Sequence, residues 1–295
     1  MSYLLSVKVA YHGLRIFLKK IYISSQLVVF GSDIGYCKAV FYKIHASICR
    51  FFFYKESSYS RFKSVGLQAL PLWGDFEAIQ KVNNWLDSRL KKSSEGYFFL
   101  PVNQNDLVVP QYLMSYFLSH YNEISKILGS HFQIHRVNIY RTYPKPKDKG
   151  DDDSSFAWHY DSAPFSMNKI FIYLDDTRRA NGAFGWLNWQ VSQRLYKSGF
   201  ISSHGMRPKS QQLVTSEIVE QENYFEGEAG SSFIFNPSIV HKGTYPYEGR
   251  RTVIVVEVYP ALRSLSLENL IKPFQKNEDS NFPAYPKWPW LNPYA

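Results

Sequence analysis

The chain has 295 residues, enough to bury a sizeable core in one large domain or in a domain with an appendage. Hydrophobic residues make up 45% and aromatic residues 17%, which excludes a disordered, highly charged chain. The net charge is +9, but residues 1–65 carry +8 of it, with ten Lys or Arg against Asp33 and Glu56. The basic character therefore belongs to the N-terminal segment and says little about the rest.

Residues 1–65 are predicted to be a basic amphipathic helical segment. Apolar residues recur at helical spacing over residues 7–22 and again over 40–52, with Lys and Arg between them. Either these helices pack on the rest of the protein with their lysines in solvent, or they make peripheral contact with an anionic membrane. No apolar stretch is long and uncharged enough to span a membrane, and no secretory signal is evident, so we expect a cytoplasmic protein.

The two cysteines, Cys37 and Cys49, both lie in this N-terminal segment. They have neither zinc-finger nor Cys-x-x-Cys spacing, so a disulfide framework is not expected.

Residues 66–295 are predicted to form one α+β domain with a mainly β core. Helical patterns occupy residues 75–128, where Asp75 is a plausible N-cap for the first helix, over 75–90, and a second runs over 106–128. After Gly129 the pattern alternates as in strands, and the core is expected at about 132–260. The expected strands are 132–143, 156–159, 169–174, 231–235 and 252–259. Residues 281–295, rich in proline and aromatics, predict an extended C-terminal cap.

A metal site is indicated by two elements far apart in the sequence. His159 and Asp161 are two positions apart, so on a strand they point to the same face. With eight histidines in the chain, such a pair alone is close to a chance event. The segment 231–243 adds a short strand, a turn and then His241. Two histidines and one carboxylate suit iron(II) and leave coordination positions open, whereas zinc more often takes three histidines or cysteines.

Ten residues after His241, Arg251 precedes an apolar strand. A guanidinium group suits bidentate capture of a carboxylate, so Arg251 is the candidate for binding the distal end of 2-oxoglutarate. Arg250 is the competing candidate, and the simpler alternative is that both arginines lie at an exposed strand end.

Four motifs together resemble a known family: WHYD at 158–161, KIFIYLDD at 169–176, NGAF at 181–184 and GSSFIFNPSIVHKG at 230–243, followed by Arg251. Over about 132–260 the chain resembles the phytanoyl-CoA dioxygenase-like family of Fe(II)- and 2-oxoglutarate-dependent oxygenases. The resemblance implies a double-stranded β-helix, a cupin-like jelly roll supported by the preceding helices. It also implies that His159, Asp161 and His241 are the catalytic iron ligands, and that Tyr140 or Arg141 helps to hold 2-oxoglutarate. Lys169 and Tyr173 are weaker candidates, and we select Tyr140.

The implied activity is hydroxylation by O2 of a small-molecule or lipid- or carrier-linked substrate, with release of succinate and CO2. Asp161 favours hydroxylation over halogenation, because related halogenases carry a small residue at this position. Residues 191–224 depart from the family pattern, and with the loop at 144–153 they are expected to shape the substrate pocket. The alternative function is a non-catalytic metal-binding jelly roll. No nucleic-acid partner is expected, because no recognised motif is present, and the oligomeric state is open.

Overall fold

The computed structural model describes residues 44–51, 59–90, 97–101, 107–145, 155–161, 167–200 and 211–262. The helix predicted at 7–22 and the cap predicted at 281–295 lie outside these ranges, so the proposed membrane contact and the domain boundary at residue 65 stay predictions. Residues 44–51 of the second predicted N-terminal helix are helical. None of the helices in the described ranges is long and apolar enough to cross a membrane.

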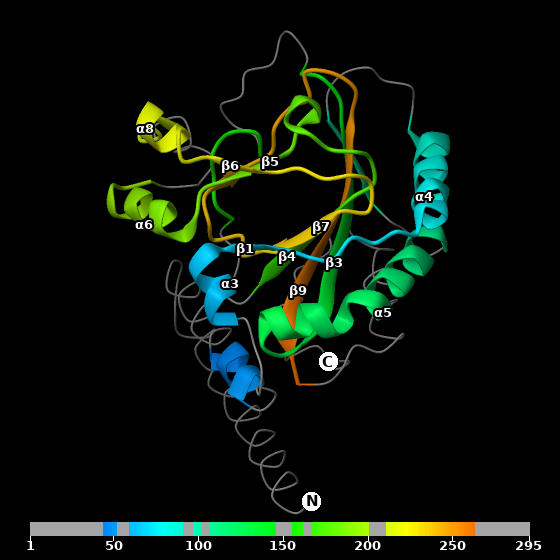
Figure 1. Cartoon of the computed structure of the whole chain (residues 1–295), viewed down its shortest axis with the longest axis horizontal. Coiled ribbons are helices and arrows are strands. Elements are labelled where there is room, and N and C mark those ends of the chain that lie inside the picture. Colours follow the sequence, from blue (N-terminus) through cyan, green and yellow to red (C-terminus); the bar gives the residue numbers. More distant parts are fainter. Residues whose placement is uncertain are drawn as a thin grey trace, which may run out of the picture.

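The core consists of two antiparallel sheets (Figure 1). The large sheet has the order β1-β7-β4-β9-β3-β2 and the small sheet the order β6-β5-β8. The large-sheet strands are β1 (Leu67–Ala69), β2 (Tyr97–Pro101), β3 (His131–Thr142), β4 (Asn168–Tyr173), β7 (Ser232–Phe235) and β9 (Arg251–Ala261). The small-sheet strands are β5 (Phe184–Trp186), β6 (Asn223–Phe225) and β8 (His241–Lys242). From β3 onward the chain passes back and forth between the sheets, and the described strands do not close a barrel; this topology confirms the predicted jelly roll.

Helices α4 (Phe76–Arg89) and α5 (Val108–Leu128) cover the outer face of the large sheet, as Figure 1 shows on the side of β3 and β9. Asp75 caps α4 as predicted, because its side chain accepts a hydrogen bond from the Ala78 amide at 3.0 Å. Gly129 ends α5 in the left-handed conformation. The shorter helices are α3 (Tyr59–Val65), α6 (Trp189–Lys197), α8 (Ser216–Val219) and the 3-10 turn η1 (Arg179–Asn181).

The alternation of side chains along β9 separates two buried layers. Ile254, Val256 and Val258 point outward and pack with α4 and α5. Val253 and Val255 point inward, where they join the aromatic residues that fill the space between the sheets. Arg251 and Glu257 share this inward parity. β9, which includes the apolar strand expected at 252–259, therefore carries two buried charged residues on its inner face, Arg251 and Glu257.

The strand predicted at 156–159 is wrong in extent. Residues 155–158 form turns and bends, and only His159 makes a β-bridge, to His241. The reason lies at Trp158, whose amide and carbonyl are bonded by the side-chain amide of Gln211 at 3.0 and 2.9 Å. The side chain of Gln211 thus makes the two backbone hydrogen bonds that a neighbouring strand would otherwise make with Trp158.

Candidate metal centre

The two histidines are brought together by backbone pairing. The His159 amide donates to the His241 carbonyl at 2.9 Å, and the His241 amide donates to the His159 carbonyl at 2.7 Å. The Asp161 amide donates to the carbonyl of Pro237 at 2.9 Å, which holds the segment after His159 against the turn before β8. Two motifs some eighty residues apart thus form one site, and the imidazole ring centroids lie 4.3 Å from each other.

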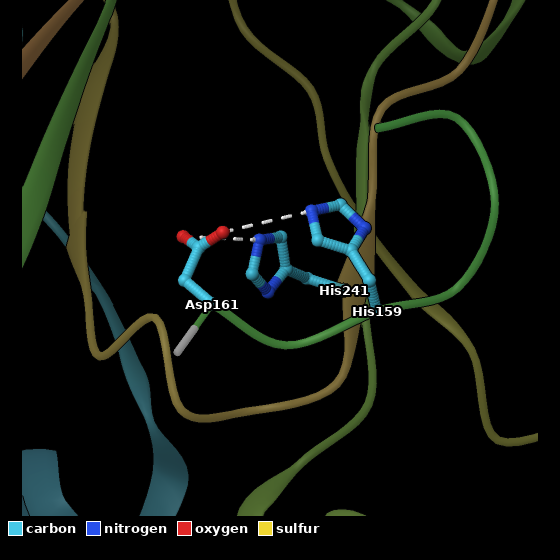
Figure 2. A group of neighbouring side chains, drawn as sticks. All are labelled: His159, Asp161 and His241. Atoms are coloured by element: carbon cyan, nitrogen blue, oxygen red, sulfur yellow. Dashed lines mark ion pairs between the residues drawn. The ribbon is translucent and has the colours of Figure 1, made fainter. Parts of the chain in front are cut away.

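Each imidazole ring is oriented by a carbonyl oxygen two residues before it. His159 Nδ1 lies 2.9 Å from the Ala157 oxygen, and His241 Nδ1 lies 2.8 Å from the Ile239 oxygen. Because a carbonyl only accepts hydrogen bonds, Nδ1 carries a proton in each contact, and Nε2 is the nitrogen that could bind a metal. Figure 2 shows both rings turned toward Asp161, with each Nε2 3.8 Å from one of its carboxylate oxygens.

The donor set fits a divalent cation. The two imidazoles direct Nε2 at one carboxylate, an arrangement that a cation between the three groups satisfies. One donor atom from each of His159, Asp161 and His241 lies within 4.8 Å of the other two. Two histidines and one carboxylate are the donor set that iron(II) takes in non-haem oxygenases.

Lys169 lies beside the triad and determines its electrostatics. Its ammonium nitrogen is 2.7 Å from Asp161 Oδ2 and 3.9 Å from Glu257 Oε1. Burial opposes ionisation of Asp161, but Lys169, His241 and His159 together hold the pKa of its carboxyl well below the usual range. Burial also opposes ionisation of Lys169 and by itself would lower the pKa of its ammonium group. Asp161 and Glu257 outweigh this effect and raise that pKa above its ordinary value. Both groups are therefore charged at neutral pH.

The structure separates the two candidate arginines. Arg251 is buried, and its guanidinium donates to the Gly182 carbonyl between the sheets. Arg250 points the other way, with Nη1 3.3 Å from Asp87 and Nε 3.5 Å from Asp175. Burial raises the pKa of the Tyr173 phenol to about 12, and Arg251 lies close enough to act against this rise. Of the two arginines, Arg251 is the one whose guanidinium lies between the sheets.

The other candidate residues lie on opposite faces of β3. Tyr140 packs with the inner aromatic cluster and is close enough to Lys169 to raise its pKa. Arg141 faces the helices, where it donates to Thr252 Oγ1 at 2.9 Å and Asn83 Oδ1 at 3.1 Å and pairs with Asp87. Arg141 thus has a structural role.

Sequence reasoning gave Lys169 little weight and did not select Glu257. A signal for both was present, since each is a charge in an otherwise apolar strand: KIFIY at 169–173 and TVIVVEVY at 252–259. Register places them directly opposite each other on β4 and β9.

Comparison of the fold with solved structures gives similarities of low sequence identity. HygX from Streptomyces hygroscopicus, with nickel and 2-oxoglutarate bound, is 13% identical, with a TM-score of 0.46 over 70% of this chain and 87% of that one. AviO1 from Streptomyces viridochromogenes Tue57 is 12% identical, with a TM-score of 0.48 over 71% and 96%. The non-haem α-ketoglutarate-dependent carbocyclase SnoK from nogalamycin biosynthesis is 14% identical, with a TM-score of 0.46 over 70% and 85%. No protein-family model and no curated protein matches the sequence.

Proposed function

We propose that the protein is an Fe(II)- and 2-oxoglutarate-dependent dioxygenase of the phytanoyl-CoA dioxygenase-like type, with iron held by His159, Asp161 and His241. The observation that carries this proposal is the convergence of the Nε2 atoms of two carbonyl-oriented imidazoles on one half-buried carboxylate within a jelly roll. Iron(II) in such a triad, together with 2-oxoglutarate and O2, supplies the oxidising power to hydroxylate a C–H bond, with release of succinate and CO2.

The surrounding residues divide the remaining tasks. The Ala157 and Ile239 carbonyls fix the imidazole rings, and Lys169 keeps Asp161 ionised. The buried guanidinium of Arg251 is suited to bind the distal carboxylate of 2-oxoglutarate. Tyr140, on the same inner face, can donate a hydrogen bond to a carboxylate oxygen of the co-substrate. The substrate proposed from the sequence is a small molecule or a lipid- or carrier-linked one.

The test is an anaerobic titration of the purified protein with iron(II) and 2-oxoglutarate, following the visible charge-transfer absorption of their complex. The wild-type protein should develop the band, and His159→Ala should lose it together with tight iron binding. His45→Ala, in the helix at 44–51, is the matched control and should behave as wild type. Iron bound by the wild-type protein without any band on addition of 2-oxoglutarate would instead indicate the non-catalytic metal-binding jelly roll.

A further inference from the structure

A row of charged residues crosses the inner face of the large sheet beside the triad. Strand register places Lys169 opposite Glu257, and Glu257 opposite Arg136 on β3. We call these three residues the charged row. Along β9, Glu257 is six residues after Arg251, and six residues of strand span about 20 Å. The charged row and Arg251 are therefore well separated along the inner face of β9.

Within the charged row, the Glu257 carboxylate is incompletely paired. Its side chain is 8% exposed, and Oε1 is 3.9 Å from the Lys169 nitrogen, which is too far for a hydrogen bond. Oε2 has no hydrogen-bond partner among the residues that the structure describes. Lys169 makes its short contact with Asp161, and Arg136 Nε donates to Asn138 Oδ1 at 3.0 Å. Burial raises the pKa of Glu257, although Lys169 and Arg136 oppose this effect.

We propose that Glu257 binds the primary substrate, and that the substrate presents to it a hydrogen-bond donor, either an ammonium or a hydroxyl group. This inference rests on the proposed oxygenase function and assigns the substrate to a polar class. A buried carboxylate oxygen without a donor is costly, so a ligand that supplies the donor gains binding energy there. An apolar acyl chain has no donor, so it would leave the Glu257 oxygen without a hydrogen bond and gain no binding energy from it.

The position of Glu257 fits substrate binding better than co-substrate binding. The 2-oxoglutarate dianion requires a cation at its distal end, which Arg251 offers at the far end of β9. Glu257 would repel that carboxylate. Lys169 links Glu257 to Asp161 through contacts of 3.9 and 2.7 Å, so a group bound at Glu257 lies next to the metal centre. A donor held there would place the adjacent part of the substrate near the iron.

The experiment measures succinate release by the iron-loaded protein with a panel of possible substrates. The panel contains amino sugars, aminocyclitols and polyols, each with its N-acetyl or deoxy counterpart, and fatty acids and acyl-CoA thioesters as apolar comparators. At least one compound with amino or hydroxyl groups should raise succinate release above the level without substrate. Loss of activity on N-acetylation identifies an ammonium donor, whereas loss only on deoxygenation identifies a hydroxyl.

Glu257→Gln should raise the KM for that compound about 10- to 100-fold, the effect of one lost charge-assisted hydrogen bond. The counterpart lacking the donor should have the same KM with wild type and with Glu257→Gln, because the two changes remove the same interaction. Glu228→Gln, at an exposed carboxylate, is the control and should match wild type. Glu257→Gln should also retain the charge-transfer band, which shows that the triad is intact.

Three results would overturn the inference: stimulation by apolar compounds alone or by no member of the panel, an unchanged KM in Glu257→Gln, or loss of its charge-transfer band. The last result would mean that Glu257 positions Lys169 and the triad. Absence of the band from the wild-type protein would instead refute the proposed oxygenase. The two failures are therefore distinguishable.

Discussion

Binding of 2-oxoglutarate should depend on Arg251 and not on its neighbour Arg250. Replacement of Arg251 by Lys keeps the charge but removes the planar pair of donors that matches a carboxylate. Arg251 is only 5% exposed, so water cannot replace the lost hydrogen bond efficiently. A charge-assisted hydrogen bond contributes about 1.5–3 kcal/mol, which predicts a 2-oxoglutarate affinity lower by roughly 10- to 100-fold. Iron affinity should change little.

Arg250→Lys is the matched control, because this side chain is 34% exposed and pairs with Asp87 and Asp175 on the other side of the sheet. Its 2-oxoglutarate affinity should stay within about twofold of wild type, since exposed ion pairs contribute little. The assay is an anaerobic titration of the iron(II) protein with 2-oxoglutarate, read from the charge-transfer band. A large loss in Arg250→Lys with wild-type affinity in Arg251→Lys would refute the assignment.

Three further predictions concern the surroundings of the site. Lys169→Met should destabilise the metal-free protein by about 3 kcal/mol in urea unfolding, because it leaves the Asp161 carboxylate without its ion pair; unchanged stability would contradict the role given to Lys169. Because the pKa of Asp161 is lower in the folded than in the unfolded protein, ionised Asp161 stabilises the fold fully above pH about 3.9, its pKa when unfolded. This stabilisation is lost as the pH falls through the lower pKa of the folded state. Asp161→Asn should therefore make the free energy of unfolding, measured in urea, depend less on pH in the acid range. Gly182→Ala should cost about 2–4 kcal/mol in thermal unfolding, because φ is +90° and a Cβ would lie 2.5 Å from the Thr244 carbonyl. It should also weaken 2-oxoglutarate binding, because Arg251 donates to the Gly182 carbonyl.

The long elements of the fold could be predicted from the sequence because burial on one face imposes a visible period. The pattern at 106–128 predicted α5 to within two residues, and the pattern at 132–143 predicted β3 to within one. The strands β5, β6 and β8 have only two or three residues, too few for a period to appear. Their pairing is decided by tertiary contacts. For the same reason the sequence of 191–224 predicts no elements, although this stretch contains most of α6, all of α8 and part of β6.

That His159, Asp161 and His241 lie together could be predicted from the order of their motifs, whereas the contacts that support them could not. Nothing in the sequence around His159 indicates that its amide and carbonyl pair with those of His241. Successive side chains of a strand point to opposite faces, so the sequence alone predicts that Arg250 and Arg251 point in opposite directions. Which of the two points inward follows only once the inner face of β9 is known. Glu257 was equally visible as a charge within an apolar run, but only the register with Lys169 and the incomplete hydrogen bonding show its significance.

The amide of Gln211 has a consequence for assembly. An exposed N–H and C=O at the edge of a sheet can pair with a strand from another molecule, which is a common start of aggregation. At Trp158 both backbone groups are occupied by one side chain, so a foreign strand finds neither donor nor acceptor there. At Trp158, next to the candidate metal ligand His159, the edge of the small sheet therefore offers no free backbone group to a strand of another molecule.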